Sequence, residues 1–195
     1  SLAARLAFAA AVRGAASGDV EFHASTSAFR RRDPARHAAA VAFFHHKTVG
    51  SRGQDLAALD AFVTAGGGLF ALHGAIASLK DEPTWAALLG AAFAGHDRPA
   101  LLAAGPSADP GPFEGIPAFA VTDELYRIRP VGAITPRFAA IAVSSGTPAA
   151  PVLWTRAHGR GRVCCCTLGH AAATLRDPAV RRIIERALAW VSGAG

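Results

Sequence analysis

The sequence is poor in several residue types, and each shortage narrows the kind of protein that it encodes. Its 195 residues include three cysteines, one tyrosine and no methionine. The cysteines are contiguous, Cys164 to Cys166, so they neither form a disulfide framework nor enclose a metal ion by themselves, because neighbouring strand residues point to opposite faces. Such cysteines indicate a reducing compartment, and we expect a cytoplasmic protein. Since methionine is absent even at residue 1, we take no expectation from where the sequence begins.

Lysine and long apolar runs are also scarce. Lys47 and Lys80 are the only lysines, so arginine supplies most of the positive charge behind the net charge of +6. The densest basic run, RRRD at 30–33, is typical of a solvated loop. No interleaving of aromatic and basic residues supports a nucleic-acid partner. No apolar run reaches the roughly 18 residues of a membrane span, so we expect no membrane partner either.

What the sequence does contain is typical of one globular α/β domain over residues 1–195. Hydrophobic residues make up 51% and charged residues 17% of the chain. An amphipathic pattern at 2–14 predicts a helix, and apolar runs at 38–44 and 68–72 predict buried strands. A helix is expected between these strands, at 54–66, ended by a glycine.

The second half of the chain predicts a different arrangement. Residues 99–136 are rich in proline and glycine and predict an irregular excursion, whereas a short alternating segment at 19–23 predicts an early strand. Later elements are expected as strands at 138–145, 151–157 and 162–168 and a helix at 177–191. Because strands alternate with helices before antiparallel strands join late, we predict a three-layer α/β/α sandwich with a mostly parallel sheet.

Histidines and carboxylates stand where such a sheet binds ligands, beyond the carboxyl ends of its strands. His73 ends a strand in AGGGLFALHGA, at a turn where many α/β enzymes carry a nucleophile, and His170 ends another in TLGHAAAT. His96 could fold back onto the same rim, and Asp123 and Glu124 form an acidic pair that could orient an imidazole or exchange a proton with it. The alternative for each is a structural role, as a strand-end or surface histidine or a carboxylate at a turn.

Two further residues are candidates for substrate binding beside Asp123. Tyr126 could stack on a sugar or simply cover the sheet. His45 follows a predicted strand, and because it is adjacent to His46, at most one of the two faces the cleft.

The segments GGGLFALHGA, WAALLGAAFAGHD, VTDELYRI and PVLWTRAHGRGRVCCCTLGH, followed by ALAWVSG, resemble the ThuA-like, or trehalose-utilisation, family over about residues 55–193. Residues 1–50 match only in layout, so site residues from that part are not assigned. The resemblance implies a flavodoxin-like, class I glutamine amidotransferase-like fold. It also implies a role in the use of trehalose, related disaccharides or keto-sugars.

By this resemblance, His73 occupies the position of the amidotransferase nucleophile and His170 that of the late-strand histidine. Glutamine hydrolysis needs a thiolate, and no cysteine stands at the turn, so we do not expect an active glutamine amidotransferase. The three cysteines are expected to be small core residues.

Three functions remain open on the sequence. The leading expectation is a sugar-acting or sugar-binding protein in which His73, His96, Glu124 and His170 form a polar cleft. They would transfer a proton or, through the three histidines, hold a divalent metal such as zinc. The alternative is a non-catalytic amidotransferase-like scaffold, sensor or subunit, and a weaker one is a cysteine-dependent hydrolase. We expect a small-molecule sugar as partner, and a homo-oligomer stays open.

Overall fold

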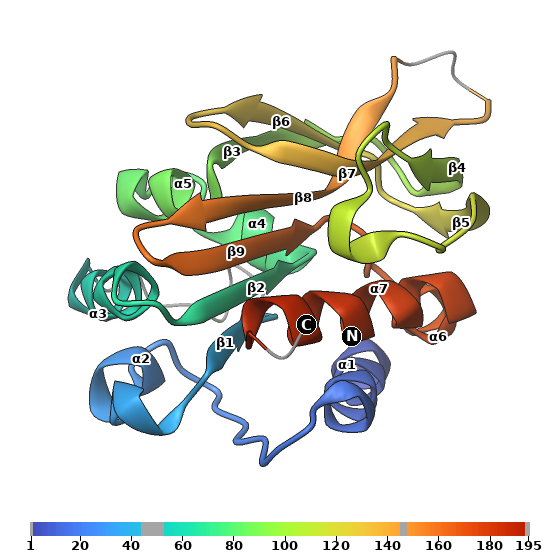
Figure 1. The fold of residues 1–195 in the computed structure, drawn as a ribbon. Helices are drawn as coiled ribbons and strands as arrows, with labels where there is room; N and C mark the ends of the chain where they lie inside the picture. The colour runs from blue at the N-terminus through green and yellow to red at the C-terminus, as the bar shows by residue number, and fades with distance from the viewer. Residues whose placement is uncertain (1, 44–52, 145–147, 194–195) are drawn as a thin grey trace.

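A seven-stranded sheet forms the centre of the computed structural model, which describes residues 2–43, 53–144 and 148–193 (Figure 1). In spatial order its strands are β1 (Ala39–Ala42), β2 (Gly68–Leu72), β9 (Gly161–Cys166), β8 (Ala150–His158), β7 (Thr135–Ala142), β4 (Ala100–Pro106) and β5 (Phe119–Asp123). A second sheet pairs β3 (Ala91–His96) with β6 (Tyr126–Pro130).

The predicted α/β class is confirmed, but the sheet is mixed rather than mostly parallel. Within the described residues, parallel pairing joins only β1 to β2 and β2 to β9. The pairs β9–β8, β8–β7, β7–β4 and β4–β5 are antiparallel. The prediction failed mainly at 99–136, where strands β4, β5 and β6 occupy the expected irregular excursion, because pairing with neighbours outweighs the local preference of proline and glycine. Residues 19–23 form no strand.

Helices cover both faces of the parallel part of the sheet. On one side lie α1 (Leu2–Ala15), α6 (Ala172–Arg176) and α7 (Pro178–Val191), and on the other α3 (Gly53–Thr64), α4 (Gly74–Ser78) and α5 (Pro83–Leu89). The shorter elements are α2 (Ala28–Arg31) and the 3₁₀ turns Pro34–Arg36 and Gly111–Phe113. None of the helices in the described part of the chain has the length and apolar character to cross a membrane.

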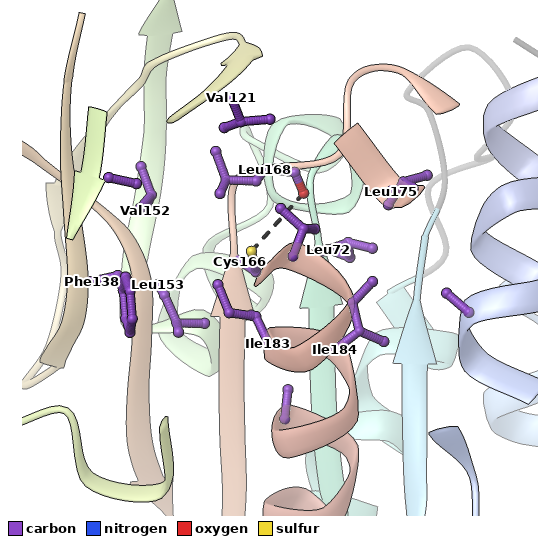
Figure 2. Packing of buried hydrophobic residues seen from close by; sticks show 14 of the residues in the cluster. Leu72, Val121, Phe138, Val152, Leu153, Cys166, Leu168, Leu175, Ile183 and Ile184 are labelled. Carbon is purple, nitrogen blue, oxygen red and sulfur yellow. Dashed lines mark hydrogen bonds between the residues drawn. The ribbon is translucent and has the colours of Figure 1, made fainter. Parts of the chain in front are cut away.

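The amphipathic helix α7 fixes the central strands from one side. Asp177 begins it as predicted, because its carboxylate accepts hydrogen bonds from the backbone N–H groups of Ala179 and Val180. Its Ile183 and Ile184 pack in the same buried cluster as Leu72 and Cys166, as Figure 2 shows. This packing holds the carboxyl ends of β2 and β9, from which the polar site described below is built.

The three cysteines lie inside β9 and contribute to both cores, as the sequence predicted. Cys164 and Cys166 belong to one hydrophobic cluster and Cys165 to the cluster on the opposite face. All three side chains are fully buried. Burial raises the pKa of each thiol, to about 12 for Cys166, so none is a ready nucleophile.

We therefore expect the native protein to resist thiol reagents at neutral pH. Mass spectrometry after brief treatment with a maleimide should detect no label on native protein and three labels on protein treated in denaturant. Rapid labelling of a cysteine in the native state would contradict this expectation and revive the cysteine-dependent hydrolase.

Candidate functional site

His73 stands at the sharp turn between β2 and α4 that the sequence predicted. Its φ of 43° makes it the only non-glycine residue with a positive φ in the described part of the chain. Such a conformation costs of order 1–3 kcal/mol and persists only where the surroundings impose it. Here the backbone N–H of His73 donates to the carbonyl of Cys166 at 2.7 Å, which extends the parallel β2–β9 ladder. The pairing thus holds His73 against the residues that follow β9.

The imidazole of His73 is buried and held in one tautomer. Its Nδ1 lies 2.7 Å from the carbonyl oxygen of Thr167, which can only accept, so Nδ1 carries the proton. Nε2 is then an acceptor, and the Tyr126 hydroxyl lies 3.3 Å from it. Burial lowers the pKa of His73, although Asp123 and Glu124 oppose this effect. Burial also raises the pKa of Tyr126, which keeps that hydroxyl protonated as a donor.

Asp123 ties the end of β5 to the loop that follows β9. Its carboxylate is fully buried and accepts hydrogen bonds from the backbone N–H groups of Glu124 at 2.7 Å, Gly169 at 2.9 Å and His170 at 3.2 Å. Since β8, β7 and β4 lie between β9 and β5 in the sheet, this contact requires the sheet to curl. Asp123 also lies 3.9 Å from His73 Nδ1.

Glu124 is the point on which three histidines converge. Its Oε2 lies 3.6 Å from His73 Nε2, and its Oε1 lies 3.2 Å from His170 Nδ1 and 3.5 Å from His96 Nδ1. The Glu124 side chain is 10% exposed, whereas His96 is 39% and His170 45% exposed. The site therefore has an enclosed inner part, His73 and Glu124, and two imidazoles that reach solvent.

His96 reaches the site on a strand, not on the expected loop. It is the last residue of β3 and pairs in register with Tyr126 of β6. Its ring stacks on that of Tyr126 with centroids 5.6 Å apart, and Phe93 meets the same tyrosine edge-on at 4.9 Å. His96 Nδ1 lies 2.8 Å from the carbonyl oxygen of Asp97, so the proton is on Nδ1 and Nε2 carries the lone pair.

The structure brings the predicted catalytic residues His73, His96, Glu124 and His170 together. Asp123 and Tyr126, predicted to bind substrate, lie within the same cluster but are enclosed, at 0% and 2% exposure. His45 lies outside the described residues.

Sequence reasoning missed Thr167. Its carbonyl sets the tautomer of His73, and its buried hydroxyl has no hydrogen-bond partner in the part of the chain that the structure describes. No sequence signal could have identified a carbonyl, because every residue carries one.

Two hollows lie away from this cluster. One, of about 320 Å³, is lined by residues of β4 and β7 together with Ala118 and Ala149, and contains no titratable side chain. The other, of about 310 Å³, lies between α1 and the Leu175–Arg181 region. Neither offers the converging acid–base groups of the histidine cluster, so the cluster is the better candidate for chemistry.

Comparison with known proteins relates the chain to one family. The ThuA family model, described as trehalose utilisation, matches residues 3–191. No curated protein sequence matches the chain.

Solved structures share the fold at low sequence identity. A ThuA-like protein from Parabacteroides merdae ATCC 43184 is 17% identical, with a TM-score of 0.84 over 99% of this chain and 85% of that one. A cytoplasmic protein from Salmonella typhimurium LT2 is 14% identical, with a TM-score of 0.68 over 96% and 86% of the two chains. A β-galactosidase from Bacillus circulans sp. alkalophilus is 14% identical, with a TM-score of 0.56 over 80% of this chain but 24% of its own.

One prediction on stability concerns the Asp123 clamp, the carboxylate that joins the end of β5 to the loop after β9. In Asp123→Asn an amide NH₂ replaces one carboxylate oxygen and meets a backbone N–H, so a buried donor loses its acceptor. We expect the free energy of unfolding to fall by about 1–3 kcal/mol in denaturant titrations. Asp97→Asn, which removes only the exposed ion pair with Arg127, should cost at most about 1 kcal/mol. Equal losses in the two variants would contradict the clamp.

Another prediction concerns the pH dependence of the free energy of unfolding. Burial lowers the pKa of His73 below that of the unfolded chain, near 6.5, so between these two values the unfolded state binds more protons. His73 therefore adds a term that makes the free energy of unfolding rise with pH up to about 6.5 and level off above it. The size of this contribution depends on burial and on the facing His170, which lower the pKa of His73, and on Asp123 and Glu124, which raise it.

His73→Asn should remove this term, because asparagine does not titrate yet tolerates a positive φ and can donate to the Thr167 carbonyl. The measurement is urea unfolding of both proteins, with chelator present, from about pH 5 to about pH 8. If the difference in the free energy of unfolding between wild type and variant does not change with pH, the conclusion that His73 is buried in its neutral form is contradicted.

Proposed function

The chain belongs to the ThuA family, and from that premise we propose that it serves carbohydrate utilisation through the cluster of His73, His96, Glu124 and His170. The observation that carries the proposal is the convergence of three imidazoles on the single enclosed carboxylate of Glu124. Groups that accept and donate hydrogen bonds, two of them open to solvent, suit the hydroxyl and carbonyl oxygens of a sugar.

His96 is the residue we propose for proton transfer. Its Nε2 carries the lone pair because Nδ1 donates to the Asp97 carbonyl, and its ring is exposed enough to meet a ligand. Glu124 Oε1, 3.5 Å from Nδ1, would stabilise the imidazolium formed when His96 takes a proton from a sugar hydroxyl or from the carbon beside a sugar carbonyl. His170, on the other side of the same carboxylate, would contact the ligand from its exposed edge.

Asp123 and Tyr126 have positioning roles in this proposal. The Asp123 carboxylate accepts hydrogen bonds from three backbone N–H groups, and the Tyr126 ring is enclosed between those of Phe93 and His96. Neither side chain is therefore placed to bind a sugar directly. Tyr126 therefore covers and orients His73 and His96. His45 stays a predicted substrate contact.

The clustering favours a ligand site over the non-catalytic scaffold, which requires no convergence of polar groups at the surface. It does not support glutamine hydrolysis, because His73 stands at the turn and the cysteines are buried. The similar fold within a β-galactosidase is a fold-level analogy only. We further infer one flavodoxin-like, three-layer domain over residues 1–195 and a cytoplasmic location, as for the similar Salmonella protein.

A thermal-shift screen with trehalose, other disaccharides and keto-sugars tests this proposal. A sugar present at 100 times its Kd adds about 2.7 kcal/mol to the free energy of unfolding, which for a domain of this size raises the Tm by about 5–10 °C. His96→Ala and His170→Ala should each lose most of this shift and still fold, because both side chains are partly exposed.

The matched control is His158→Gln. His158 ends β8 beside the first residue of β9, at the opposite end of β9 from the loop that carries His170, and its side chain pairs with Asp60 at 2.7 Å. The variant should therefore keep the full shift in Tm. The proposal fails if no sugar shifts the wild-type Tm, or if the two cluster variants respond as the wild type does.

A further inference from the structure

We propose that His73, Glu124 and His170 bind a divalent transition metal ion of the zinc type. This inference rests on the proposed function, because it names what the same cluster holds beside the sugar. The three residues come from three separate parts of the chain: the β2–α4 turn, the β5–β6 junction and the loop after β9. Two imidazoles with one carboxylate are a ligand set typical of catalytic zinc and related ions.

The distances fit an ion at the centre of the three groups. One ligand atom from each residue can be chosen so that all lie within 4.8 Å of one another. Two atoms bound at about 2.0–2.1 Å with tetrahedral angles lie about 3.3–3.4 Å apart. Glu124 faces each imidazole with a different oxygen, Oε2 at 3.6 Å from His73 Nε2 and Oε1 at 3.2 Å from His170 Nδ1, so coordination through one oxygen requires the three side chains to close from within 4.8 Å.

The surroundings of His73 have the form that metal-binding histidines need. A coordinating imidazole binds through one nitrogen and donates from the other to a carbonyl or carboxylate, which fixes the ring. His73 donates from Nδ1 to the Thr167 carbonyl and directs Nε2 toward Glu124 and the Tyr126 hydroxyl, whose hydrogen bond an ion would replace. The strained backbone at His73 and the parallel β2–β9 ladder hold this orientation before any ion arrives.

The charges of the site also favour a cation. Asp123 and Glu124 are two adjacent, enclosed carboxylates. Among the described residues, the groups within ion-pair distance of them are histidines, with no arginine or lysine. Asp123 is balanced by backbone N–H groups, whereas Glu124 faces imidazoles alone. A divalent ion would supply the missing positive charge.

Three protein ligands would leave one position of a tetrahedral ion open and a second when the ion expands to five ligands. The exposed side chain of His170 gives this site access to solvent. A sugar offers two neighbouring oxygens, as a diol or a hydroxy-ketone, which suit two adjacent positions of one ion. His96 keeps its Nε2 for proton transfer, since it is not among the ligands. The metal thus specifies the ligand class as sugars with a chelating pair of oxygens.

The test is metal binding by the full chain after treatment with chelator. Calorimetry with Zn²⁺, and visible absorption with Co²⁺ as a spectroscopic probe, should show one ion per chain. Glu124→Gln keeps the shape of the side chain and should weaken metal binding by about 100-fold. Losing a residue that only supports a ligand already costs about 10- to 100-fold, and Glu124 is itself a proposed ligand. His170→Ala should do the same, and because its side chain is 45% exposed, its fold is not at risk.

His158→Gln, remote from the cluster, should bind metal as the wild type does. The inference is overturned if neither ion binds, or if Glu124→Gln and His170→Ala bind as tightly as the control. Sugar screens on chelated and Zn²⁺-loaded protein separate the two proposals. Sugar binding without any metal binding leaves the proposed function standing and refutes the metal, whereas metal binding without any sugar response does the reverse.

Discussion

The parallel pairing of β2 with β9 is the constraint on which the site depends. It places the ends of two strands from opposite halves of the chain at one rim, and it continues by one residue into the strained turn at His73. Without that extra hydrogen bond to Cys166, nothing in the ladder would hold His73 in an unfavourable backbone conformation. The imidazole lies against the Thr167 carbonyl, so the backbone contact to Cys166 and the side-chain contacts to Thr167 and Tyr126 together hold the ring.

A second constraint, the carboxylate of Asp123, closes the site from the far edge of the sheet. Asp123 accepts hydrogen bonds from the backbone of Glu124 and from the backbone of Gly169 and His170. It therefore brings Glu124 and His170 together, although the two residues are not paired in a sheet. As a result, the residues of the site differ in their exposure to solvent. The inner groups are rigid and enclosed, and His96 and His170 stand at the surface where a ligand can reach them.

The sequence could predict the part of this arrangement that follows from strand direction. His73 directly follows β2 and His170 lies in the loop after its parallel neighbour β9, so their meeting at one rim followed from the apolar runs before them. The acidic pair and His96 were identified by residue type, but their positions could not be derived. They depend on the curl that carries β5 back to β9 and on the pairing of β3 with β6, two long-range features that leave no local pattern. The burial of Asp123 and Tyr126 was invisible for the same reason, since it arises only when those strands meet.

The charges around the cluster also narrow the kind of sugar that the proposed site would bind. The protein as a whole is strongly basic, with a net charge of +6, yet the described residues of the site contribute carboxylates and imidazoles. Arg127 follows Tyr126 in β6, but its guanidinium pairs with Asp97 at 2.8 Å. A sugar phosphate would need arginine, lysine or a set of free backbone N–H groups to balance its charge. Asp123 already occupies the N–H groups of Gly169 and His170 that could have formed such a set. For the sugar ligand that we propose, an uncharged sugar is therefore the better match, and the same charges favour the proposed cation over an anion beside Glu124.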